Sequence, residues 1–256
     1  MEKEEKKILN SLFVPLTFLV LMWLVKVAEW TFGIRLSFLG IHPLHADGLP
    51  GIVLSPFIHG DWKHLAANSI PILVLGSALY FFYRPIATKV LSLIILLTGL
   101  WVWLGARESY HIGASGVIYG LSSFLLISGF IRRETGLMAL SLIVVFLYGS
   151  MIWGIFPELF PEKNISWEGH LSGLIAGIVL AIFYRREGPQ RRRYSWELEE
   201  DHDEQTTVYE QVDETEQAGE TEKPAKIEEK PYWDIPEPDR NDLTVVYRFK
   251  GKNSKG

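Results

Sequence analysis

Two long apolar runs follow each other in HLAANSIPILVLGSALYFFYRPIATKVLSLIILLTGLWVWL, residues 64–104. The first covers residues 64–83 and the second 87–104, and a short connection around Arg84 separates them. Each run has the length of about 17–25 residues that a helix needs to cross a bilayer. This stretch therefore predicts two consecutive membrane-spanning helices and excludes a single soluble domain.

Apolar stretches of similar length flank this pair, at residues 9–28, 115–131, 137–156 and 167–184. The connections after residue 64 are short, so we predict an all-α membrane protein with a compact bundle of six transmembrane helices. The segment 31–63 is interrupted by prolines, and we expect it to form a loop along the membrane surface.

The chain changes in character after residue 186. Residues 187–256 begin with a basic run, then become strongly acidic and are poor in aliphatic clusters. Such a composition cannot bury enough apolar area to offset chain entropy. We therefore predict a membrane domain at 1–186 and a disordered cytoplasmic tail at 187–256. The chain contains no cysteine, which excludes disulfides, thiol nucleophiles and Cys-based metal sites.

Lysines and arginines in short loops indicate the orientation of the bundle, because they favour the cytoplasmic side. With six spans both termini share one side, and that side receives twelve of these residues. The opposite side receives four, namely Arg35, Lys63, Arg107 and Lys163. We therefore expect a multi-pass protein of the plasma membrane with cytoplasmic termini, embedded in the lipid bilayer and without a nucleic-acid partner.

Polar side chains are few in the predicted spans, and three of them fall at one depth. Asn68, Ser115 and His170 lie 16, 17 and 15 residues before the arginines that close their spans, which are Arg84, Arg132 and Arg185. Because a helix rises about 1.5 Å per residue, all three lie about 22–26 Å above the cytoplasmic ends. His64 lies one helical turn from Asn68, on the same face. The spacing predicts a polar site near the outer face of the membrane.

Each of these residues also has a purely structural explanation. A serine in a membrane helix often bonds to its own backbone, and Asn68 can form an interhelical hydrogen bond. Ser115 differs, because Gly113 and Gly116 bracket it where a loop enters a helix. The unpaired N–H groups at such a helix start can stabilise an oxyanion.

Two spans carry glycines four residues apart directly after the reactive side chains, Gly116 and Gly120 in one, Gly173 and Gly177 in the other. This spacing lets helix backbones approach closely, and it is also a common packing motif without further function. If the two faces pack together, Ser115 and His170 come within hydrogen-bonding distance.

A serine beside a neutral imidazole forms a nucleophile–base pair. No Asp or Glu lies in the interior of the last five predicted spans, and the nearest carboxylates, Glu108 and Glu168, are expected at the rim of the site. We therefore predict a Ser115–His170 dyad and not a triad. Ser115 would attack a peptide carbonyl, and His170 would take its proton and return it to the leaving amine. His64, Asn68 and the backbone N–H of Ser115 would stabilise the oxyanion. This chemistry needs no cofactor and no metal.

These residues resemble the rhomboid family of intramembrane serine proteases over about residues 50–184. GASG at 113–116 matches the family's GxSG motif, HLAAN at 64–68 matches HxxxN, and GHLSGLIAG at 169–177 matches the pattern of the sixth span. GIRL at 33–36 departs from the family, which often has a Trp-Arg pair in that loop.

The resemblance implies Ser115 as nucleophile, His170 as base, and His64 and Asn68 on the oxyanion side. It also implies that the ring of Tyr119 stacks on the catalytic imidazole, and His59 occupies a position where the family often has a histidine. A rhomboid-type six-helix bundle with an outward-opening cavity is expected. Single-pass membrane proteins, cut near the membrane surface, are the expected substrates.

Three other functions compete with proteolysis. A catalytically inactive rhomboid-like protein would bind membrane clients, but such relatives lack the dyad. A transporter or channel predicts polar residues at several depths and an internal repeat, and the sequence has neither. A zinc site could use the histidines expected on the outer side, which are His42, His45, His59, His64, His111 and His170. A metal site without cysteine usually recruits carboxylates at helical spacing, and no HExxH occurs in the sequence.

Overall fold

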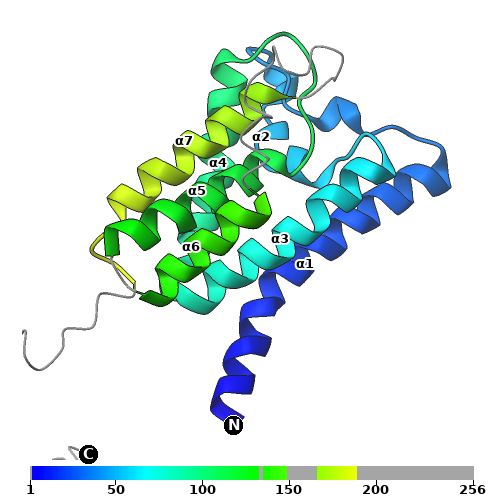
Figure 1. The fold of residues 1–256 in the computed structure, drawn as a ribbon. Helices are drawn as coiled ribbons and strands as arrows, with labels where there is room; N and C mark the ends of the chain where they lie inside the picture. Colours follow the sequence, from blue (N-terminus) through cyan, green and yellow to red (C-terminus); the bar gives the residue numbers. More distant parts are fainter. Residues whose placement is uncertain (1, 133–134, 149–165, 189–256) are drawn as a thin grey trace, which may run out of the picture. The chain divides into compact units, whose positions relative to one another are not determined.

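The computed structural model describes residues 2–132, 135–148 and 166–188, all within one compact unit, Met1–Arg193. The described backbone is helical and contains no strand, apart from one isolated antiparallel bridge between Ile41 and His111. The helices run in the order α1 (Glu2–Phe32), η1 (Ser37–Leu39), η2 (Ala46–Gly48), α2 (Gly51–Leu54), η3 (Ser55–Phe57), α3 (Trp62–Phe82), α4 (Ala87–Gly105), α5 (Ser115–Arg132), α6 (Thr135–Tyr148) and α7 (Trp167–Phe183) (Figure 1).

Four of the described helices are long and apolar enough to cross a membrane: α1, α3, α4 and α5. They agree with the predicted spans to within a few residues, except that α1 begins well before residue 9. Helix α7 is apolar but has 17 residues, and 14 residues of α6 are described. The structure therefore confirms an all-helical membrane protein, while the count of six spans stays a prediction.

Polar caps fix the starts of the two helices that carry the predicted histidines. Asp61 precedes α3, and its carboxylate accepts a hydrogen bond from the backbone N–H of His64 at 2.7 Å. Ser166 precedes α7, and its hydroxyl accepts one from the N–H of Gly169 at 3.2 Å. Because an N-cap satisfies donors that the first turn leaves unpaired, it sets the residue at which each helix begins.

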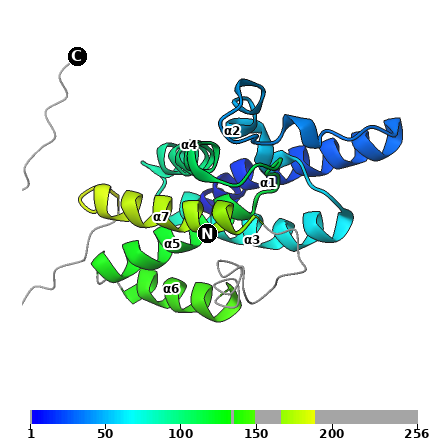
Figure 2. The same cartoon turned by 90° about the horizontal axis from the view of Figure 1, so that it is seen from above.

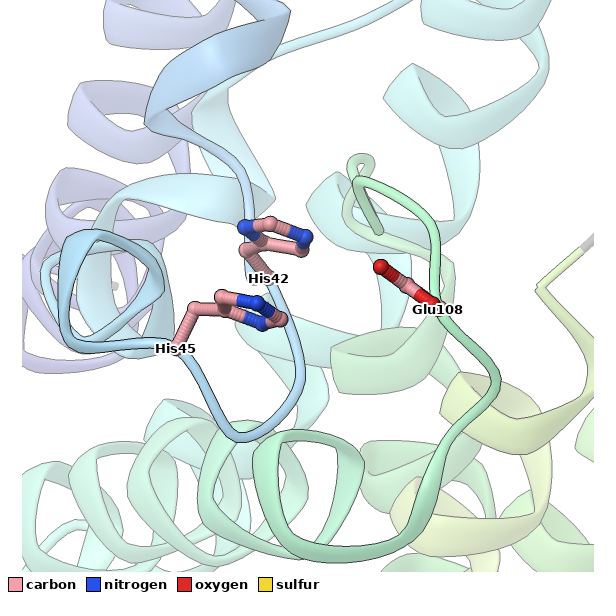
Figure 3. A group of neighbouring side chains, drawn as sticks. All are labelled: His42, His45 and Glu108. Atoms are coloured by element: carbon pink, nitrogen blue, oxygen red, sulfur yellow. The ribbon is translucent and has the colours of Figure 1, made fainter.

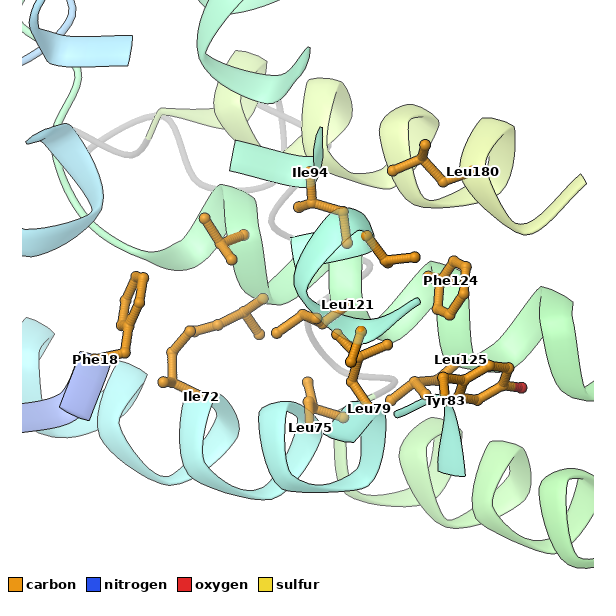
Figure 4. Packing of buried hydrophobic residues seen from close by; sticks show 14 of the residues in the cluster. Phe18, Ile72, Leu75, Leu79, Tyr83, Ile94, Leu121, Phe124, Leu125 and Leu180 are labelled. Atoms are coloured by element: carbon orange, nitrogen blue, oxygen red, sulfur yellow. The ribbon is translucent and has the colours of Figure 1, made fainter. Parts of the chain in front are cut away.

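Helix α5 is the centre of the bundle and packs against α7, α6, α3 and α4 (Figures 1 and 2). Apolar side chains from α1, α3, α4, α5 and α7 form its core, among them Phe18, Leu75, Ile94, Phe124 and Leu180 (Figure 4). Other large apolar side chains point outward, such as Phe13, Ile70 and Phe183. An apolar outer surface of this kind suits a lipid environment.

Glycine brings α5 and α7 into backbone contact. A Cβ on Gly173 would overlap the carbonyl oxygen of Gly116, and one on Gly177 would overlap that of Gly120. Any residue other than glycine would place a Cβ in this space. The two helices therefore pack along the faces that the small-residue spacing predicts.

The segment between α1 and α3 forms a loop with short helical turns, as its prolines predict. It is held at two points. The Nζ of Lys26 on α1 donates to Glu29 at 3.1 Å and to the carbonyl of His59 at 2.8 Å. Ile52 packs against Gly99 of α4, where a Cβ would lie 2.8 Å from the Cα of Ile52.

Several predictions fall outside the described residues. They are the second half of the span 137–156, the loop that contains Lys163, and the disordered state of the tail. The boundary at residue 186 also stays a prediction.

Candidate active site

Ser115 and His170 meet where α5 and α7 begin. Ser115 is the first residue of α5, and His170 lies in the first turn of α7. The Oγ of Ser115 and the Nε2 of His170 are 2.9 Å apart, a hydrogen-bonding distance. His170 is buried and Ser115 is half-buried. This pair has the geometry of a nucleophile and its general base.

Tyr119 lies one turn after Ser115 and covers the His170 ring. The two ring centroids are 4.4 Å apart, and the planes differ by 12°, so the rings are stacked. Tyr119 is itself buried. The stack limits rotation of the imidazole and holds Nε2 toward Ser115.

His64 and Asn68 project from the first turns of α3, which packs against α5. His64 lies against Gly113, since a Cβ at Gly113 would be 2.6 Å from the Cε1 of His64. Gly113 has a φ of +106°, a conformation that other residues rarely adopt. Glycine is thus required twice here, for the turn into α5 and for the approach of the imidazole.

The side chain of Asn68, one helical turn after His64, carries a free donor. Asn68 is buried, and within the described part of the chain its Nδ2 has no hydrogen-bond partner. A buried amide without a partner is costly, so its presence calls for an explanation such as a ligand oxygen.

His59 supports His64 from the loop that precedes α3. The two rings meet edge to face with centroids 5.0 Å apart. Burial lowers the pKa of His59 to about 4, with a further contribution from His64. His59 is therefore neutral at physiological pH and adds no charge beside the site.

The carboxylates near the site are engaged elsewhere. Glu168 is buried at the start of α7, and its Oε1 lies 3.4 Å from the Nε of Arg107. Glu108 is exposed in the loop before α5 and faces His42 and His45. Both positions agree with the expectation that acidic residues stay at the rim.

A link that the spacing along the chain does not predict joins the starts of α5 and α7. The Nδ1 of His111 lies 2.7 Å from the Oγ of Ser166, and its Nε2 lies 3.0 Å from the carbonyl of Arg107. Since a carbonyl only accepts, Nε2 carries the proton and Nδ1 accepts from the Ser166 hydroxyl. This link fixes the N-cap of α7 to the loop that leads into Ser115.

A small cavity borders the pair inside the bundle. Its lining includes Ser115, Ser55, Thr98 and His111. The Thr98 hydroxyl is buried and has no hydrogen-bond partner among the residues described. Polar groups of this kind can hold water.

Comparison with known proteins identifies relatives of this chain. The rhomboid domain model matches residues 47–187. An uncharacterized protein of Mycobacterium tuberculosis is 39% identical over 183 residues, which cover 69% of this chain and 75% of the relative. An uncharacterized protein of Mycobacterium leprae is 36% identical over 184 residues, 69% of this chain and 72% of the relative.

A third relative carries the family in its name. A rhomboid protein of Acanthamoeba polyphaga mimivirus is 31% identical over 139 residues, which cover 52% of this chain and 73% of the relative. The domain match covers more than half of the chain and all of the predicted site residues. Together with four helices that are able to cross a bilayer, it identifies an integral membrane protein of the rhomboid family.

Proposed function

We propose that this protein is an intramembrane serine endopeptidase that cleaves transmembrane segments of other membrane proteins. The observation that carries the proposal is the distance of 2.9 Å between the Ser115 hydroxyl and the His170 imidazole. Membership of the rhomboid family points to the same class of reaction. Two residues 55 positions apart in the chain meet at this distance only because α5 and α7 pack through glycine.

Acylation begins with attack by the Ser115 Oγ on a peptide carbonyl of the substrate. His170 accepts the hydroxyl proton at Nε2 and returns it to the leaving amine, so that the peptide bond breaks and an acyl-enzyme forms. The carbonyl oxygen becomes negative in the tetrahedral intermediate. The Nδ2 of Asn68, the His64 ring and the backbone N–H of Ser115 are the donors proposed for this oxyanion.

Deacylation needs a water molecule at Ser115. The small cavity beside Ser115, whose wall includes Ser55 and Thr98, offers a place from which water reaches the ester. His170, again neutral, takes a proton from this water as its oxygen attacks the ester carbonyl. When the second tetrahedral intermediate collapses, His170 returns the proton to the Ser115 Oγ, and the product leaves with a new carboxyl terminus.

The proposed topology puts this chemistry near the outer face of the membrane. Six spans give cytoplasmic termini, a membrane domain at 1–186 and a cytoplasmic tail at 187–256. The plasma membrane is the proposed location. A substrate helix would unwind near the surface and present an extended peptide bond to Ser115, because a helical peptide bond is shielded by its own hydrogen bonds.

Cleavage of a reporter with a single transmembrane helix tests the proposal. Purified wild-type and Ser115→Ala proteins are reconstituted in proteoliposomes with a chelator present. We expect cleavage by the wild type and none by Ser115→Ala or His170→Ala. A fluorophosphonate probe should label the wild type and fail to label Ser115→Ala, and this readout does not depend on the choice of reporter.

The main competitor is a rhomboid-like protein that binds membrane clients without cutting them. It predicts neither cleavage nor fluorophosphonate labelling of the wild type. Equal cleavage by wild type and Ser115→Ala would also reject the proposal, because it would show that Ser115 is not the nucleophile.

A further inference from the structure

Two histidines and a glutamate from separate loops meet outside the active site. His42 and His45 lie between η1 and η2, and Glu108 lies between α4 and α5 (Figure 3). One ligand atom of each residue lies within 4.8 Å of the other two. The imidazole rings of His42 and His45 are stacked, with centroids 3.9 Å apart. All three side chains are exposed or half-buried and thus accessible from solvent.

Hydrogen bonds at Nδ1 prepare both imidazoles to bind a metal ion. The Nδ1 of His45 lies 2.8 Å from the carbonyl of Pro43, which can only accept. The Nδ1 of His42 lies 3.3 Å from each carboxylate oxygen of Asp47, and Tyr110 donates to the same carboxylate at 3.3 Å. Each Nδ1 therefore carries the proton, and each Nε2 keeps its lone pair. This carboxylate–histidine arrangement is the usual outer shell of a metal ligand.

The backbone between the two histidines is strained in a way that places both rings together. Leu44 has a φ of +61°, a left-handed conformation that is uncommon for a residue other than glycine. Its side chain is exposed, so burial of leucine does not explain the conformation. Strain of this kind persists where the surroundings hold it, and it concentrates at functional sites.

The surroundings do hold this turn against the end of α4. The N–H of Leu44 donates to the carbonyl of Trp103, and the indole N–H of Trp103 donates to the carbonyl of His45, both at 2.9 Å. Ile41 and His111 exchange two backbone hydrogen bonds of 2.9 Å. The loop with the histidines and the loop with Glu108 are therefore fixed to each other before any ion binds.

We propose that His42, His45 and Glu108 bind a divalent transition-metal ion of the Zn²⁺ class. Two imidazoles and one carboxylate are ligands that Zn²⁺ accepts, with water at the fourth position. Ligands at about 2.0–2.2 Å from an ion lie roughly 3.3 Å from one another. The His42 and His45 rings lie in nearly parallel planes, 4° apart, so the exposed His45 ring has to turn and Glu108 has to rotate before the three ligands meet one ion. The carboxylate comes from another loop, which is why spacing along the chain does not predict this site.

The ion would join the loop before α2 to the loop that leads into Ser115. This site is separate from the dyad, and the proposal does not depend on proteolysis. Its consequence is mechanical: the bound ion restrains residues 106–114, which connect α4 to the first residue of α5.

Titration with ZnCl₂ against a chromophoric zinc indicator tests the proposal. The full-length protein is purified in detergent without a polyhistidine tag and stripped with a chelator. Because the acidic tail contains a histidine, every protein carries His202→Ala. We expect one zinc per chain. Glu108→Gln and His45→Ala should weaken binding more than about 100-fold, since loss of an outer-shell partner alone costs about 10–100-fold.

Two further variants sharpen the test. Asp47→Asn should weaken binding by about 10-fold or more without abolishing it, because it replaces the negative carboxylate that orients and polarises His42 with a neutral amide. Glu187→Gln, which removes an exposed carboxylate elsewhere in the chain, should leave zinc affinity unchanged. Thermal unfolding without metal checks that Glu108→Gln, an exposed and nearly isosteric change, retains the fold.

The readout of loop mobility is independent of affinity. Zinc should slow amide hydrogen exchange at residues 41–48 and 106–111 in the wild type and leave it unchanged in Glu108→Gln. The proposal is overturned if wild type and Glu108→Gln bind zinc with the same affinity, or if the wild type binds none.

Discussion

Tyr119 shows how a single side chain can hold the general base. Its ring stacks on His170 with centroids 4.4 Å apart. Such a stack is worth about 0.5–1.5 kcal/mol, so Tyr119→Ala should lower kcat roughly 2- to 10-fold as the imidazole gains freedom. Tyr119→Phe keeps the ring and should retain most of the rate. Reporter cleavage by both variants measures this, and equal rates for Tyr119→Ala and wild type would contradict a positioning role.

His59 should make stability depend on pH. Its pKa is about 4 in the folded protein, because burial disfavours the charged ring, and about 6.5 when unfolded. Between these values the unfolded chain binds a proton that the folded chain does not. Stability should therefore fall as pH drops from about 6.5 to about 4, by up to about 3 kcal/mol from this group.

His59→Gln isolates this contribution from those of all other groups. Thermal unfolding in detergent at pH 7.5 and pH 5 should show a smaller loss of Tm for His59→Gln than for the wild type. An identical loss in both proteins would mean that His59 is not the group responsible.

At the residue scale, depth along the helices together with the glycine spacing predicts that Ser115 and His170 lie close together. The helical rise converts sequence position into height, so residues of separate spans can be compared without knowing the packing. The link between His111 and Ser166 could not be predicted in this way. It joins two loop residues. The conformation of a loop depends on tertiary contacts, and these do not follow a helical repeat that could be recognised in the sequence.

Among the elements, α5 and α7 depend most directly on glycine. A Cβ on Gly173 would overlap the carbonyl oxygen of Gly116, which is backbone and cannot rotate away. Gly173→Ala should therefore separate the helices, destabilise the protein by about 1–3 kcal/mol or more and lower cleavage, because Ser115 and His170 move apart.

Gly105→Ala is the matched control for this substitution. Gly105 ends α4, and a Cβ there meets nothing within 4 Å. Its Tm and cleavage rate should stay close to those of the wild type. Normal stability and full activity of Gly173→Ala would show that the close approach of α5 and α7 is not needed.

The ends of the elements were harder to predict than their centres. The sequence predicts that Arg132 closes its span at the cytoplasmic surface. In the structure, however, its side chain is buried and donates to the carbonyl of Tyr184 at 2.7 Å. Lys26 is similar, since it lies in an apolar run but binds Glu29 and the loop before α3. A hydropathy profile counts such residues only as charges. The packing shows which hydrogen-bond acceptors compensate each buried cation.

At the scale of the whole molecule, topology follows from the number of spans between two loops. Three predicted spans separate the loop before α5 from the tail, so these two segments should lie on opposite sides of the membrane. Helix α6 is the critical one, because 14 of its residues are described and a spanning helix needs about 17 or more. If α6 did not cross, the two segments would lie on the same side.

The absence of cysteine allows this question to be answered with one label per chain. Ser109→Cys, exposed before α5, should react with a membrane-impermeant maleimide in intact cells, whereas Ser195→Cys in the tail should react only after permeabilisation. The cysteine-free parent controls for background labelling. Labelling of both positions in intact cells would require an even number of crossings between them and would remove either α6 or α7 from the proposed spans. Labelling of Ser195→Cys alone would preserve the odd number but invert the orientation, and the Ser115–His170 site would then face the cytoplasm.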